Sequence, residues 1–201
     1  MMKGISIKIS SFLCENNIVE KDKQELYTYA LEIFLSSTLH IFTTLFIGFI
    51  CGMPLESLTM YLVFSLVRRY AGGFHAKTPL RCYLTSVAAI ILMLILIKVF
   101  TKLENDMVFY VTLTISNLTI WIASPIESTN KKLSYKEKKV FKGVSIALSS
   151  IITVLAVMVY EIFAVNFGVS IGFGLVLTAL VLHTSLIHDM LYSKRKNTMA
   201  N

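Results

Sequence analysis

The stretch Tyr83–Phe100, YLTSVAAIILMLILIKVF, decides the fold class of this chain, because Lys98 is its only charged residue. A helix needs roughly 20 predominantly apolar residues to cross the hydrocarbon core of a bilayer, so the stretch predicts a transmembrane helix. Similar apolar runs occur on both sides of it. Together they predict an all-α polytopic membrane protein with about six spans, at residues 30–50, 55–67, 83–100, 107–123, 144–165 and 167–187.

The composition of the whole chain supports this fold class. Charged residues make up only 15% of the sequence, whereas about 25% is usual in a soluble domain. The net charge of +7 raises the question of a nucleic-acid partner, but the Lys and Arg residues lie between the apolar runs, where membrane topology accounts for them. We therefore expect the lipid bilayer as a partner, no nucleic acid, and a single membrane domain over residues 1–201.

Residues 1–29 precede the first predicted span and have a different pattern. They contain acidic residues and no continuous apolar run, so they do not resemble a cleavable signal peptide. Apolar residues instead recur at helical spacing, at Ile5, Ile9, Phe12 and Leu13. This pattern predicts an amphipathic helix that lies in the membrane interface, with a break at Asn16-Asn17 before a second helical stretch continues into the first span.

The distribution of Lys and Arg predicts the orientation in the membrane. With a cytoplasmic N-terminus, 17 of the 19 basic residues fall on the inside, and only Lys98 and Lys102 fall on the outside. Cytoplasmic segments of membrane proteins carry the excess of Lys and Arg. Both termini and the segment 68–82 are therefore expected on the cytoplasmic side of a multi-pass plasma-membrane protein.

The segment 68–82 holds the residues with the clearest chemistry. Thr78-Pro79 has the pattern of a helix N-cap followed by proline at the first helical position, which places Cys82 about one turn into the next helix. There the helix dipole favours a negatively charged thiolate, the nucleophilic form of cysteine. The same segment supplies positive charge that favours the thiolate further, at Arg68, Arg69, Lys77 and Arg81.

His75 is the candidate general base for Cys82. It follows Gly72-Gly73, which allow backbone turns that other residues resist. The loop contains no Asp, Asn or Gln that would orient the imidazole, and the candidates for this supporting role are Glu32, Thr78 and Ser86. The alternative is a structural one, in which the cysteine packs as a small apolar residue and the histidine lies among lipid headgroups.

The other cysteines give no sign of a metal or redox site. Cys14 and Cys51 form no CxxC pair and have no neighbouring metal-ligand residues. We therefore expect neither a disulfide, nor a metal ion, nor another cofactor. His40 lies inside the first predicted span, and the sequence assigns it no role.

The run RRYAGGFHAKTPLRCYLTS, residues 68–86, resembles the core of the AgrB family, which are membrane cysteine endopeptidases of Gram-positive quorum-sensing systems. The resemblance covers most of the chain, including the amphipathic N-terminal segment and the apolar runs. It implies that His75 is the base and Cys82 the nucleophile. It also implies that Arg68 and Gly73 matter for activity.

The resemblance further implies an AgrD-like precursor peptide as the substrate. Cys82 would attack at the junction with the acidic C-terminal tail and hold the remaining peptide as a thioester, from which a thiolactone or lactone ring would close. The family also suggests a homodimer. Close helix packing in such a dimer would be allowed by small residues in the last span, namely Gly168, Gly172 and Gly174.

Two alternatives remain open at this point. The lysine-rich segment 125–143 is explained either by topology and anionic lipid or as a surface that steers the acidic tail of the substrate. The steering hypothesis concerns Lys131, Lys132, Lys136, Lys138 and Lys139. The alternative to a peptidase is a peptide channel or exporter, in which Cys82 would be dispensable.

Overall fold

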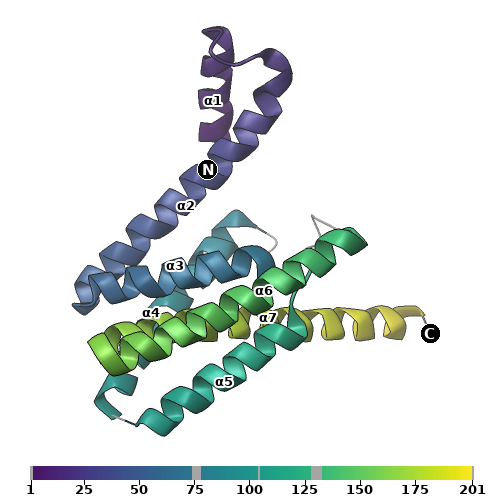
Figure 1. Cartoon of the computed structure of the whole chain (residues 1–201). Helices are drawn as coiled ribbons and strands as arrows, with labels where there is room; N and C mark the ends of the chain where they lie inside the picture. Colours follow the sequence, from purple (N-terminus) through teal and green to yellow (C-terminus); the bar gives the residue numbers. More distant parts are fainter. Residues whose placement is uncertain (1, 74–77, 104, 128–132, 201) are drawn as a thin grey trace.

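The computed structural model describes residues 2–73, 78–103, 105–127 and 133–200, and the regular elements in these ranges are helices, which confirms the all-α fold class (Figure 1). The helices are α1 (Met2–Glu15), η1 (Lys21–Lys23), α2 (Gln24–Cys51), α3 (Pro54–Ala71), α4 (Pro79–Leu103), α5 (Asp106–Ala123), α6 (Tyr135–Met158), the π-helical turn η2 (Val159–Phe163) and α7 (Val165–Ala200).

Five helical segments are long and apolar enough to cross a bilayer, which makes the chain a polytopic membrane protein. They are Lys21–Cys51, Leu80–Leu103, Asp106–Ala123, Tyr135–Phe163 and Val165–His188. Helix α3 contains the predicted span 55–67 but is not in this group. The division into six spans, with α3 as the second, therefore stays a prediction.

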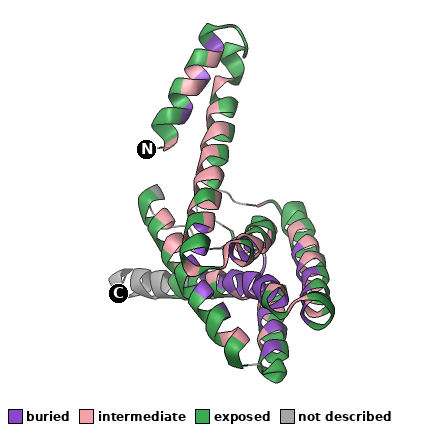
Figure 2. Ribbon diagram, turned by 90° about the vertical axis from the view of Figure 1, so that its left-hand side faces the viewer, coloured by how far each residue is buried: buried purple, intermediate pink, exposed green. Residues whose placement is uncertain are grey.

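Helix α7 is the central helix of the bundle. In its apolar stretch Val165–His188, 67% of the most hydrophobic window is buried, against 22% or less in each of the other four segments. Figure 2 shows the buried residues gathered in the part of the molecule away from α1. A helix surrounded by others cannot be recognised from its own sequence, because its apolar residues look the same whether they face lipid or protein.

The glycines of α7 allow this helix to pack closely against other elements of the same chain. A Cβ atom on Gly168 would lie 2.5 Å from the Cα of Tyr160, and one on Gly174 would lie 2.6 Å from Val63 Cγ1. Gly172 is likewise close to Leu113, at 2.9 Å. These small residues let α7 approach η2, α3 and α5, so their presence does not support the predicted homodimer, which stays a prediction.

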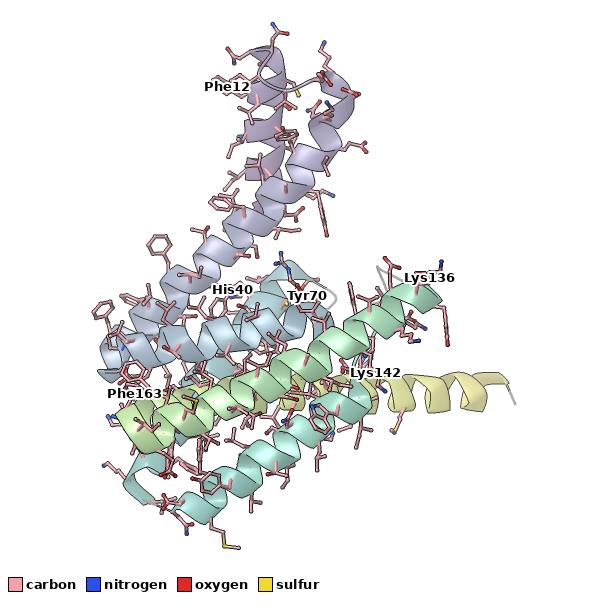
Figure 3. The ribbon with its side chains drawn as sticks, viewed as in Figure 1. Phe12, His40, Tyr70, Lys136, Lys142 and Phe163 are labelled. Atoms are coloured by element: carbon pink, nitrogen blue, oxygen red, sulfur yellow. The ribbon has the colours of Figure 1, made fainter. Side chains whose placement is uncertain are left out.

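Helix α1 forms a hairpin with the first half of α2 that stands away from the other helices (Figure 1). Its serines face α2: the hydroxyls of Ser10 and Thr28 are 2.6 Å apart, and Gln24 donates a hydrogen bond to Ser11. The chain turns after Glu15, with Asn17 at a positive φ of 55°, as predicted. Phe12 is exposed on the outer side of α1 (Figure 3), which suits a helix in the membrane interface.

Candidate functional site

Cys82 lies in the first turn of α4, at the position that the Thr78-Pro79 pattern predicts. The backbone N–H of Arg81 donates to the Thr78 hydroxyl at 3.4 Å, and the N–H of Cys82 donates to the Thr78 carbonyl at 3.0 Å. Thr78 is therefore the N-cap of α4, while its own side chain is exposed. The thiol of Cys82 is half-buried and unpaired with any other cysteine.

A cavity of about 1080 Å³ opens beside Cys82. Among the described residues it is lined by α2, α3, α4 and α7, by residues 125–127, and by residues at the start of α6. Most of its wall is apolar, with side chains such as Ile90, Met93 and Leu177. A volume near the upper end of the usual range for ligand pockets allows a peptide segment, not only a small molecule.

Arg68 places a positive charge in this cavity. Its guanidinium lies 5.3 Å from the centre of the Phe64 ring, and Arg68 and Cys82 line the same cavity. Burial lowers the pKa of Arg68, but an arginine stays protonated in proteins. Arg69 also lines the cavity but is exposed, so the two predicted arginines differ in their surroundings.

Gly72 and Gly73 are fixed between two elements far away in the sequence. Gly72 has φ 76° and forms a parallel bridge with Ile126, whose N–H donates to the Ala71 carbonyl at 3.0 Å. A Cβ atom on Gly72 would lie 2.1 Å from the Ile126 carbonyl oxygen, and one on Gly73 would lie 2.7 Å from Val181 Cγ1. The chain that leads toward position 75 is therefore held by α7 and by the segment after α5.

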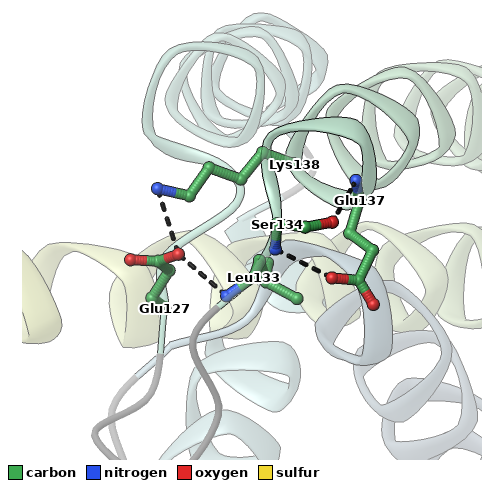
Figure 4. A network of polar contacts seen from close by, with 5 residues as sticks. All are labelled: Glu127, Leu133, Ser134, Glu137 and Lys138. Carbon is green, nitrogen blue, oxygen red and sulfur yellow. Dashed lines mark hydrogen bonds and ion pairs between the residues drawn. The ribbon is translucent and has the colours of Figure 1, made fainter.

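The start of α6 is held at the edge of the cavity by a polar network (Figure 4). The Glu127 carboxylate accepts from the Leu133 N–H at 2.9 Å and pairs with Lys138 at 3.0 Å. Ser134 and Glu137 form a capping box, the reciprocal pair of hydrogen bonds that satisfies the first turn of a helix. Because Glu127 and Leu133 also line the cavity, this network belongs to its wall.

The remaining predicted site residues fall into three groups. Ser86 lines the cavity, whereas Glu32 is half-buried on α2 and is absent from the lining. The exposed lysines of the first turns of α6 lie at its projecting end (Figure 3), and they are Lys136, Lys138 and Lys139. The predictions for four further residues lie outside the described ranges: His75, Lys77, Lys131 and Lys132.

The sequence did not reveal several residues of this site. Ile126, Glu127 and Val181 reach it from other parts of the chain, and no local pattern marks them. His40, which had no predicted role, lines the same cavity as Cys82.

The fold and the site together define a polytopic helical membrane protein with a cysteine and an arginine on the wall of a cavity between its helices. The family model described as "Accessory gene regulator B" matches residues 6–184. The chain therefore belongs to the AgrB family, which implies involvement in accessory gene regulator quorum sensing and a link to the AgrD precursor.

Curated relatives support this membership. The chain is 26% identical over 169 residues to an AgrB-like protein of Clostridium perfringens, covering 80% of this chain and 77% of the relative. It is 25% identical over 167 residues to the accessory gene regulator protein B of Staphylococcus carnosus, covering 81% of this chain and 86% of the relative. No solved structure matches the chain.

Proposed function

We propose that this protein is a membrane-embedded cysteine endopeptidase that removes the C-terminal tail of an AgrD-like precursor peptide. The observation that supports it most is the position of Cys82, half-buried in the first turn of α4 and on the wall of a large cavity that Arg68 also lines. Co-expression with an AgrD-type precursor, read out by peptide mass, tests it. From the distribution of Lys and Arg we infer that the loop 68–82 and both termini face the cytoplasm from the plasma membrane.

The proposed reaction has two acyl transfers. His75 takes the thiol proton of Cys82, the sulfur attacks the carbonyl carbon at the tail junction, and the C–N bond breaks as the proton passes to the leaving amine. The peptide stays on Cys82 as a thioester. A cysteine or serine side chain of the peptide then attacks the same carbonyl, its proton goes to the Cys82 sulfur, and a thiolactone or lactone leaves.

The cavity supports the second step. A thioester exposed to water would be hydrolysed and would yield a linear peptide. Apolar side chains line most of the space next to Cys82, with Ile90 and Met93 from α4 and Leu177 from α7. Exclusion of water from such a space protects a reactive intermediate, so the internal nucleophile of the peptide has time to attack.

Arg68 is the residue that we expect to stabilise the developing oxyanion. Removing one such group from an active site costs about 100-fold to 1,000-fold in rate. Arg68→Gln should therefore lower tail removal about 100-fold, measured by peptide mass. Arg69→Gln removes the same charge from an exposed neighbour and is the matched control. Equal losses in the two variants would contradict a specific role for Arg68.

A second prediction concerns the exposed lysines at the start of α6 and the acidic tail of the substrate. We propose that they attract the acidic tail, which raises the rate of encounter more than the affinity. Combined Lys136→Gln and Lys139→Gln should slow tail removal at low substrate concentration about tenfold at low salt and much less at high salt, because salt screens exposed charges. Lys138 is left in place because it pairs with Glu127.

The control for the lysine variants is a double replacement of Lys3 and Lys8, two exposed lysines of α1, by glutamine. It produces the same change in net charge at a distance from the cavity. If both double variants slow the reaction equally, or if the effect of the α6 variant does not depend on salt, steering by these lysines is refuted.

A further inference from the structure

His40 is a histidine in a membrane-spanning helix that lines the same cavity as Cys82. Its ring is stacked on Tyr61 of α3, with centroids 6.3 Å apart, and meets Tyr83 of α4 at 5.3 Å. The Tyr83 hydroxyl lies 2.7 Å from that of Thr43 on α2. Three helices therefore hold the imidazole in one orientation, where α2 meets α3 (Figure 3).

The two ring nitrogens of His40 have different surroundings. Nδ1 is buried and has no hydrogen-bond partner within the part of the chain that the structure describes. A buried N–H without an acceptor is rarer and more costly than an unpaired acceptor, so the ring proton belongs on Nε2. Since the ring is part of the cavity wall, Nε2–H is the donor that a molecule in the cavity can reach.

His40 is one of several polar side chains that line the cavity along α2. Ser36 and Ser37 precede it by one helical turn and line the same cavity. On α3, Tyr61 lies seven residues before Arg68, which at 1.5 Å per residue is about 10 Å further along the helix. The Arg68 guanidinium lies over Phe64, between these two positions, so the cavity wall near His40 carries neutral hydrogen-bonding groups together with a positive charge.

A neutral donor inside an apolar space selects a ligand with carbonyl groups. A peptide backbone in such a space must find partners for its C=O groups, whereas the hydrocarbon tail of a lipid has no polar group to satisfy. We propose that His40 binds the precursor peptide by donating a hydrogen bond from Nε2 to a backbone carbonyl of the segment that stays on Cys82. This inference rests on the proposed function.

The test is the affinity of a fluorescent synthetic AgrD-type precursor for the full chain in lipid nanodiscs. The Cys82→Ala background keeps the peptide intact. His40→Phe preserves a ring between the two tyrosines but removes the donor, and His40→Asn moves the amide to the position of Nδ1. Both should raise the Kd about tenfold. His40→Gln, whose amide nitrogen reaches the position of Nε2, should stay within about threefold of the Cys82→Ala protein.

His183→Phe is the matched control, because His183 is an exposed histidine of α7 that is absent from the cavity lining, and its Kd should not change. The proposal is overturned if His40→Phe and His40→Asn bind as tightly as the background. It is also overturned if His40→Gln binds as weakly as His40→Phe, because a donor restored at the position of Nε2 would then not restore the affinity.

Cleavage of the same peptide by the chain with Cys82 intact is measured in parallel. Absence of cleavage, together with weaker binding to His40→Phe, would remove the proposed peptidase and leave the role of His40 standing. Cleavage that depends on Cys82, together with unchanged binding to His40→Phe, would support the proposed peptidase and refute the role of His40.

Discussion

Replacing Cys82 with alanine should abolish removal of the tail from a co-expressed AgrD-type precursor, and so should His75→Ala. The loss should be at least about 1,000-fold, because removing the nucleophile or its base disables a catalytic unit almost completely. The measurement is the mass of the peptide recovered from cells, which should carry the intact tail in both variants and lack it with the wild-type chain.

The other two cysteines supply the control for this prediction. Cys14 is buried in the α1–α2 hairpin and Cys51 ends α2, and neither lines the cavity. Their replacement by alanine should leave processing within about twofold of wild type. A peptide channel or exporter would tolerate Cys82→Ala as well, so unchanged processing in that variant would favour transport over proteolysis.

Replacing Gly72 with alanine should lower tail removal by about 100-fold. The new Cβ would lie 2.1 Å from the Ile126 carbonyl oxygen, which is backbone and cannot rotate away. The residue also has φ 76° and ψ −150°, a conformation that is essentially restricted to glycine. The segment after Ala71 would have to shift, and the candidate base at position 75 would shift with it. Processing is measured as for Cys82→Ala.

Gly143→Ala is the matched control for Gly72→Ala. Gly143 lies on α6, and a Cβ atom added there meets no atom within 4 Å. This variant should process the precursor like wild type. Full activity in Gly72→Ala would show that the pairing of Gly72 with Ile126 does not position the site.

Sequence patterns correctly predicted the features that depend on neighbouring residues, such as helix starts and breaks. The apolar run of α4 and the Thr78-Pro79 cap fixed the position of Cys82 in the first helical turn, and the break after Glu15 followed from the asparagines. Each depends on residues within a turn or two of one another. The family resemblance then assigned chemistry to the cysteine.

Contacts between segments far apart in the chain could not be predicted from the sequence. The pairing of Gly72 with Ile126 joins residues that no periodicity relates. The ion pair between Lys138 and Glu127 is another contact that no local pattern marks. The sequence marks His40 only as an ionisable residue inside a span, because a single sequence does not show that its ring lies against Tyr61 and Tyr83.

The most direct measurement of the central claim is the intact mass of the wild-type protein after brief mixing with a precursor whose ring-closing cysteine or serine is replaced by alanine. Since this peptide cannot cyclise, the proposed thioester should accumulate. We predict a mass increase equal to the peptide without its tail, located on Cys82, removed by hydroxylamine and absent from Cys82→Ala. Release of the tail with no adduct on Cys82, or an identical adduct in Cys82→Ala, would contradict the acyl-enzyme mechanism.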